Sequence, residues 1–215
     1  MRYRVPIILL LLLATLPCLP VKAQGIDYNI LCSLQQQRTP AMDNIMVWTS
    51  NSLVLAPCVP ASLLTYGFAT DNQQLVSIGT ATGISFLTAF AVTEAVKYSV
   101  QRPRPYIAYT DDLIPVKTTI GYSFPSGHTS LTFATATSLS LSCRKWYIVG
   151  PSMLWATGVA FSRLYLGVHY PSDVLTGIAV GILSGFAGYW LSQKICADAE
   201  IPPAKVLTPP IMLRF

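Results

Sequence analysis

Five long apolar stretches without a single charged residue constrain this chain more than any other feature. They cover residues 52–69, 75–92, 129–141, 146–161 and 174–191. An uncharged apolar helix of about 20 residues can cross a bilayer, where a helix satisfies its own backbone hydrogen bonds. Several stretches are shorter than this, so some must extend into flanking turns or be shielded by neighbouring helices. The pattern predicts an all-helical, polytopic transmembrane bundle.

The composition supports a membrane protein. Of the 215 residues, 52% are hydrophobic and only 11% are charged, whereas soluble domains average about 25% charged residues. The apolar stretches also contain small residues that allow close helix contact in lipid. These are Gly79, Ala81, Gly83, Gly177, Gly181, Gly185 and Gly188. A soluble helical bundle remains the alternative. The net charge of +5 includes no basic run longer than two residues, which argues against nucleic acid binding.

The N-terminal 23 residues have the pattern of an export signal. Arg2 and Arg4 precede an apolar core over 5–16, and small residues at Val21 and Ala23 suit cleavage before Gln24. We predict a signal peptide over 1–23 and five membrane spans. The alternative is that this segment is retained as a first transmembrane helix, which gives six spans.

The remaining chain divides into a membrane domain and a tail. The domain is expected over 24–196, with an interfacial or packing helix within 26–51. Residues 197–215 contain four prolines and predict an irregular tail. Because 215 residues are too few for two comfortable domains, one domain is expected.

Positive charges in the loops orient the bundle. By the positive-inside rule, Arg144, Lys145 and Lys194 lie in the cytoplasm, while segments 97–128 and 163–173 lie outside. Both alternatives for the N-terminus give this orientation. The sequence therefore predicts a multi-pass protein of a bacterial inner membrane, with these two segments facing the periplasm or the exterior.

Cationic residues gather at the predicted outer ends of the helices. Charges beside membrane spans are costly and usually functional. Lys97, Arg104 and Arg163 could neutralise a phosphate dianion, and guanidinium groups suit bidentate contact with phosphoryl oxygens. A helix that begins near Ser126 would direct free backbone N–H groups at the same anion, and Gly127 would allow close approach. Ser126 by itself could equally be only a helix N-cap.

The chain has only two histidines, and both fall within this polar set. Pro171 lies between His169 and Asp173, which predicts a helix whose first turn brings the carboxylate to the imidazole. A carboxylate on one ring nitrogen leaves the other free to attack. Imidazole titrates near neutrality, so one histidine can attack while the other donates a proton. We interpret His169 as the nucleophile and His128 as the acid.

Three sequence blocks lie in order between the apolar stretches. Lys97, six residues and Arg104-Pro105 form the first block, Pro125-Ser126-Gly127-His128 the second, and Ser162-Arg163, five residues, His169, three residues and Asp173 the third. Together they resemble the signature of the type 2 phosphatidic acid phosphatase superfamily. That superfamily includes lipid phosphate phosphatases, bacterial acid phosphatases and vanadium haloperoxidases.

The resemblance implies a role for each residue of the blocks. Phosphate would be held by Lys97, Arg104, Ser126, Gly127 and Arg163. His169 would form the phosphoenzyme, Asp173 would orient it and His128 would protonate the leaving group. No metal or cofactor is implied. The spacing selects Arg104 over Arg102, so Arg102 is interpreted as a solvated charge at the rim, and Glu94 as an ion-pair partner of Lys97.

The sequence thus predicts a membrane hydrolase that removes phosphate from a lipid phosphate or diphosphate through a phosphohistidine. Undecaprenyl diphosphate, phosphatidylglycerophosphate and the phosphates of lipid A stay open as substrates, and the bilayer is the expected partner. A periplasmic acid phosphatase acting on soluble phosphomonoesters is the alternative. Stretches 75–92 and 174–191 are uncharged around their whole circumference, which disfavours it. A vanadate-dependent haloperoxidase is less favoured because such enzymes are larger, and a silent membrane scaffold because every catalytic position is filled.

Overall fold

The computed structural model describes residues 24–198, and these residues form helices and loops without strands. The helices are α2 (Gln24–Gln36), α3 (Pro40–Asn51), the 3₁₀ helix η2 (Ser52–Val54), α4 (Leu55–Ala69), α5 (Gln73–Val100), α6 (Pro105–Ala108), α7 (Gly127–Cys143), α8 (Trp146–Tyr165) and α9 (Pro171–Asp198). The predicted all-helical fold is confirmed. The predicted signal peptide and the tail beyond Asp198 lie outside the described residues.

Each apolar stretch forms a helix that is longer than the stretch itself or merges with a neighbouring helix. Both α5 and α9 have 28 residues. Among residues 24–198, three segments are long and apolar enough to cross a membrane: Pro40–Ala69, Gln73–Ala108 and Pro171–Cys196. The protein is therefore a multi-pass membrane protein, while the total of five or six spans stays a prediction.

The segment before the first stretch contains two helices where one was expected. Thr39 caps α3 by accepting from the Met42 N–H at 3.3 Å, and Pro40 occupies the first turn. The 3₁₀ turn η2 then carries the helical path directly into α4, giving 30 continuous residues. The side chain of Trp48 on this path is 79% exposed. The apolar span thus begins well before Ser52, where the sequence pattern had placed its start.

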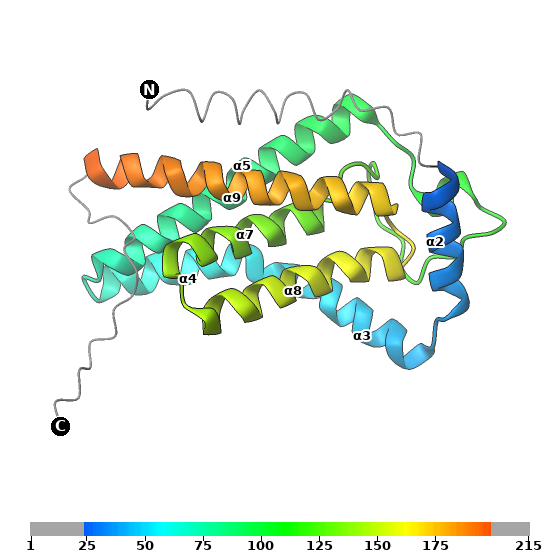
Figure 1. Ribbon diagram of the computed structural model, residues 1–215, viewed down its shortest axis with the longest axis horizontal. Coiled ribbons are helices and arrows are strands. Elements are labelled where there is room, and N and C mark those ends of the chain that lie inside the picture. The colour runs from blue at the N-terminus through cyan, green and yellow to red at the C-terminus, as the bar shows by residue number, and fades with distance from the viewer. Residues whose placement is uncertain (1–23, 199–215) are drawn as a thin grey trace.

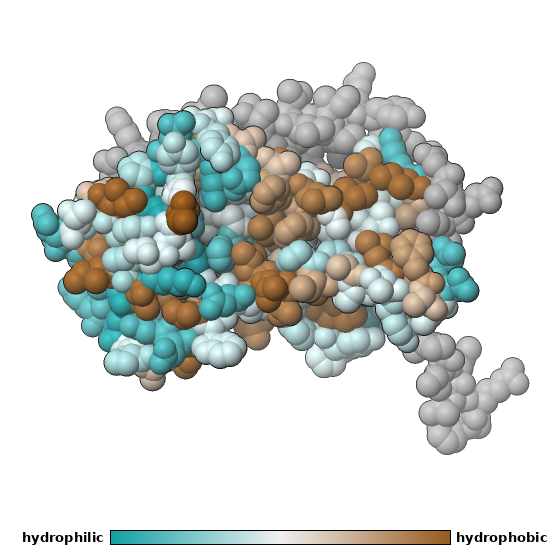
Figure 2. Space-filling view, turned by 180° about the vertical axis from the view of Figure 1, so that it is seen from behind, coloured by the Kyte–Doolittle hydropathy of each residue, from teal (hydrophilic) through white to brown (hydrophobic). Residues whose placement is uncertain are grey.

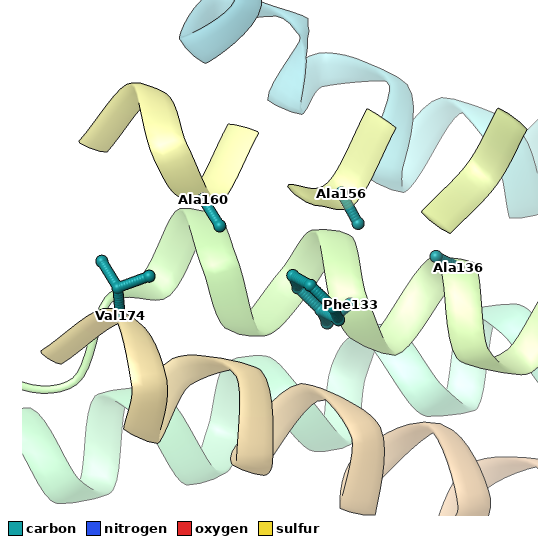
Figure 3. Packing of buried hydrophobic residues seen from close by; sticks show 5 residues of the cluster. All are labelled: Phe133, Ala136, Ala156, Ala160 and Val174. Atoms are coloured by element: carbon teal, nitrogen blue, oxygen red, sulfur yellow. The ribbon is translucent and has the colours of Figure 1, made fainter. Parts of the chain in front are cut away.

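Helix α7 lies at the centre of the bundle. Eleven of its 17 residues are buried, and it packs lengthwise against α5, α8 and α9 (Figure 1). Phe133 of α7 clusters with Ala156 and Ala160 of α8 and Val174 of α9 (Figure 3). The short, Ser- and Thr-rich stretch of α7 is thus shielded from lipid by its neighbours, as expected.

Glycines let α9 approach α7 and α5 closely. A Cβ added at Gly181 would lie 2.6 Å from the Ser130 carbonyl oxygen of α7, and one at Gly188 would lie 2.3 Å from Ser85 Oγ of α5. Contacts this short leave no room for a side chain. The prediction that these glycines serve close helix packing is confirmed, and packing of this kind holds helices together where lipid surrounds them.

The outer surface divides into an apolar flank and a more polar end. Figure 2 shows hydrophobic residues along the helical flank and hydrophilic residues gathered toward the end that carries α2. Large exposed apolar side chains of the long helices include Phe68, Leu154 and Leu175, each at least 66% exposed. Such a flank suits contact with acyl chains.

Candidate active site

The three sequence blocks meet at one end of the bundle. The C-terminal ends of α5 and α8 and the N-terminal ends of α7 and α9 lie there, together with loop 101–126 and α2 (Figure 1). Antiparallel packing of consecutive helices produces this convergence. The structure therefore brings together all the residues that the sequence proposed for the site.

His169 lies in the short turn between α8 and α9 and is only 2% exposed. Its Nε2 lies 3.2 Å from Nη1 of Arg104. Because a guanidinium group can only donate, Nε2 must carry the lone pair and Nδ1 the proton. Burial lowers the pKa of His169 to about 4; Asp173 opposes this shift, while the charges of Arg163 and Arg104 add to it. The imidazole is therefore neutral at pH 7, and its lone pair is on Nε2, where it accepts from Arg104.

Asp173, in the first turn of α9, is completely buried beside His169. Its Oδ2 lies 3.6 Å from His169 Nδ1, so the pair is in electrostatic contact, and a shift of about 0.6 Å would close a hydrogen bond. The carboxylate also accepts from the Tyr170 N–H at 2.9 Å, from Arg102 Nη1 at 2.7 Å and from the Ser123 hydroxyl. These donors fix the direction in which the carboxylate points.

Arg104 joins two loops of the site and is 3% exposed. Its Nε and Nη2 donate to the carbonyls of Gly121 and Ile120 at 2.9 and 3.0 Å, and Nη1 donates to the Val168 carbonyl at 2.9 Å. With the contact to His169, four of its five N–H donors are engaged. Arg104 thus ties loop 101–126 to the turn that bears the nucleophile candidate.

The second block forms the first turn of α7. The Ser126 N–H donates to the Asp173 carbonyl at 3.1 Å, and the Ser126 hydroxyl pairs with that of Thr129 at 2.9 Å. A Cβ added at Gly127 would lie 3.4 Å from Lys97 Nζ. Lys97 Nζ therefore lies beside the N-terminal end of α7, where its positive charge and the positive end of the helix dipole both favour a bound anion. The expected ion pair between Lys97 and Glu94 is confirmed at 3.4 Å.

Arg163, near the end of α8, is 3% exposed. Its Nη1 donates to the hydroxyl of Ser50 from α3, whereas its Nε is buried without a hydrogen-bond partner among residues 24–198. A buried donor without an acceptor is costly. This N–H is available to an anion bound among the cationic side chains.

His128, in the first turn of α7, is partly buried and lies within electrostatic range of Lys97, Arg104, Arg163 and His169. Cations surround it. A phosphate dianion bound among these cations would stabilise the imidazolium form of His128. Binding of the phosphate dianion would therefore favour protonation of His128, the form that an acid catalyst needs.

The interpretation of Arg102 as a solvated rim charge is wrong. Its side chain is 12% exposed and makes ion pairs with Asp173 at 2.7 Å and with Asp27 of α2 at 3.0 Å. Its guanidinium carbon also lies 3.7 Å from the centroid of the Tyr170 ring. Motif spacing could not reveal these contacts, because one partner lies in a helix far from the three blocks.

Sequence reasoning also missed Ser50, Ser123 and Asp27. Ser50 and Ser123 support Arg163 and Asp173, and single serines outside the blocks carry no recognisable signal. Asp27 did carry a faint one, since it is an acidic residue between Ile26 and Tyr28. Within the described residues, no group of three or more His, Cys, Asp or Glu side chains could hold a metal ion.

The fold and the site define a multi-pass helical membrane protein with cationic side chains gathered around a buried histidine. A model of the PAP2 superfamily matches residues 75–196. The chain belongs to the PAP2 superfamily, and the predicted family is confirmed.

Curated relatives agree with this assignment. The chain is 30% identical to lipid A 1-phosphatase of Porphyromonas gingivalis over 183 residues, covering 83% of this chain but only 38% of the relative. It is 33% identical to undecaprenyl-diphosphatase BcrC of Bacillus subtilis over 156 residues, covering 72% of this chain and 77% of that one.

The fold is similar to the crystal structure of a transmembrane PAP2 type phosphatidylglycerolphosphate phosphatase from Bacillus subtilis. The TM-score is 0.67 at 25% identity, and the match covers 88% of this chain and 96% of the other. The relatives' names are those of phosphatases that act on lipids, which agrees with the predicted enzyme class.

Proposed function

We propose that this protein is a membrane phosphatase that hydrolyses a lipid phosphate or diphosphate through a phosphohistidine on His169. The observation that carries the proposal is the state of that histidine. Its Nε2 holds a lone pair among cationic side chains, while its Nδ1 faces Asp173. A neutral, oriented imidazole among cationic side chains suits nucleophilic attack on a phosphoryl group.

The reaction proceeds in two steps. His169 Nε2 attacks phosphorus, the bond from phosphorus to the leaving oxygen breaks, and His128 donates a proton to that oxygen. Water then attacks the phosphohistidine with His128 as the base, which releases phosphate and restores His169. Lys97, Arg104, Arg163 and the N–H group of Gly127 stabilise the negative charge on the phosphoryl oxygens.

The proposed location follows from the loop charges. Arg144 and Lys145 lie between α7 and α8, at the end of the bundle opposite the site. By the positive-inside rule, that end is cytoplasmic and the site faces the periplasm or the exterior of a bacterial inner membrane. The lipid headgroup would then reach the cationic side chains of the site at the periplasmic or exterior surface of the inner membrane.

A panel of substrates tests the proposal. Detergent-purified protein is given undecaprenyl diphosphate, phosphatidylglycerophosphate, lipid A and a soluble phosphomonoester, and phosphate release is measured. We expect release from at least one lipid, persistence of activity in a metal chelator, inhibition by vanadate and loss of activity in His169→Ala. A strong preference for the soluble ester would overturn the lipid substrate, and full turnover by His169→Ala would overturn the mechanism.

A further inference from the structure

Asp27 is a buried acidic residue in α2, far outside the region 75–196 that the family model matches. It is 2% exposed. Its Oδ1 accepts from the Ser172 N–H at 3.1 Å, and its Oδ2 accepts from the Ser172 hydroxyl and from Arg102 Nη2 at 3.0 Å. Burial of a carboxylate is costly unless it is paired. The contacts of Asp27 are therefore specific, and all of them lead to the first turn of α9.

Arg102 links Asp27 to the catalytic carboxylate candidate. Its Nη2 faces Asp27, its Nη1 donates to Asp173 at 2.7 Å, and its plane lies over the ring of Tyr170. A guanidinium group presents its donors in a rigid fork, so holding one arm fixes the direction of the other. Nη1 also donates to the Ser172 hydroxyl at 2.8 Å, and that hydroxyl is itself held by Asp27. Asp27 thus helps, directly and through Ser172, to fix where Arg102 meets Asp173.

The charge balance points the same way. Arg102 carries one positive charge and is shared by two carboxylates, so the cluster of Asp27, Arg102 and Asp173 has a net charge of −1. That negative charge lies 3.6 Å from His169 Nδ1, measured at Asp173 Oδ2. Without the charge of Asp27, Arg102 would neutralise Asp173 alone. The developing positive charge on a phosphorylated imidazole would then lose its counterion.

We propose that Asp27 is a positioning residue for phosphoryl transfer, acting through Arg102 and Asp173 on His169. This inference rests on the proposed function. It makes α2 part of the catalytic apparatus, although the three sequence blocks lie far from it in the chain.

The test compares Asp27→Asn with a matched control, Asp43→Asn. Asp43 of α3 is also paired with an arginine, Arg38, at 3.4 Å, and within residues 24–198 its carboxylate makes no hydrogen bond or ion pair with His169, Asp173 or Arg102. We expect Asp27→Asn to lower kcat about tenfold or more, as loss of an outer partner of a functional histidine often does, with KM within about twofold. Asp43→Asn is expected to keep both values. As a control, thermal unfolding of each variant in detergent is measured, and kcat is compared at a temperature below every unfolding midpoint.

A double variant distinguishes two roles of Asp27: positioning of Arg102 for catalysis, and attachment of α2 to the rest of the bundle. If Asp27 acts through Arg102, then Asp27→Asn lowers kcat little or not at all in an Arg102→Gln background. A purely structural role for Asp27 predicts instead a lower unfolding midpoint with unchanged kcat, and additive effects in the double variant. Either of these results overturns the proposal.

Vanadate binding gives a readout that does not depend on the lipid. Vanadate mimics the phosphoryl group in its bond to the nucleophile, so its affinity reports on His169. We expect about tenfold weaker vanadate binding in Asp27→Asn than in the wild type or in Asp43→Asn. Equal affinities would overturn the role of Asp27 while leaving the proposed function intact. Wild-type protein that binds vanadate but releases no phosphate from the lipid panel would instead count against the lipid substrates alone.

Discussion

At the scale of single residues, the two ring nitrogens of His169 have different surroundings. Nε2 meets a permanent donor in Arg104, and Nδ1 meets the carboxylate of Asp173. This asymmetry selects one tautomer, and burial keeps the ring uncharged. Spacing alone placed Asp173 one turn from His169, but it could not show that Arg104 selects the tautomer.

The titration of His169 gives the first prediction. Because burial lowers its pKa to about 4, the ring stays neutral as the pH falls from 8 to 5 and takes up a proton only near pH 4. An unfolded chain binds that proton near pH 6.5, so this residue lowers the stability of the fold progressively as the pH falls from about 6.5 to about 4.

NMR of the protein with labelled histidine measures this titration directly. The chain has two histidines, so the His128→Asn variant leaves a single signal. We expect its ring shifts to be constant between pH 8 and 5. A midpoint near pH 6.5 would contradict the buried, neutral state.

At the scale of helices, α9 supplies both Asp173 and a row of glycines through which α9 packs closely against α7. Gly177 lies against the Ser126 carbonyl, and Gly181 and Gly185 lie against α7 further along. The small residues in the sequence predicted close packing. They did not predict that this packing also joins the second and third blocks, because the partner of each glycine is set only by the folded bundle.

A pair of glycine substitutions tests this packing. A Cβ at Gly181 would lie 2.6 Å from both Phe133 Cβ and the Ser130 carbonyl oxygen, whereas one at Gly150 of α8 would meet nothing within 4 Å. We expect Gly181→Ala to destabilise the fold by about 1–3 kcal/mol, the usual cost of overpacking, and Gly150→Ala to be tolerated. Unfolding midpoints in detergent measure the difference. Equal midpoints would mean that α9 does not seat on α7 as described.

At the scale of the whole molecule, the sequence predicted the helical membrane bundle and the meeting of its three blocks at one end. Uncharged stretches indicate helices strongly, and the blocks fall where those stretches end. The support for the site could not be predicted in the same way. Asp27 in α2 and Ser50 in α3 reach Arg102 and Arg163 across more than 70 residues of chain, and no local pattern encodes such contacts.

The orientation of the molecule is a prediction at this scale. In a variant in which serine replaces the five native cysteines, a single cysteine is introduced at Thr118, near the site, or at Trp146, at the opposite end. We expect a membrane-impermeant maleimide to label Thr118→Cys in intact cells and to label Trp146→Cys only after the membrane is opened. The reverse pattern would place the site in the cytoplasm.

The central claim is that the phosphoryl group is transferred to His169, and trapping the phosphoenzyme tests this claim most directly. Protein incubated with a lipid substrate labelled with ³²P in the transferred phosphate is quenched in alkali, where phosphohistidine is stable, and separated from lipid. The account predicts protein-bound label in the wild type that is lost in acid and is absent from His169→Ala. Label that survives acid, or that persists in His169→Ala, would contradict it.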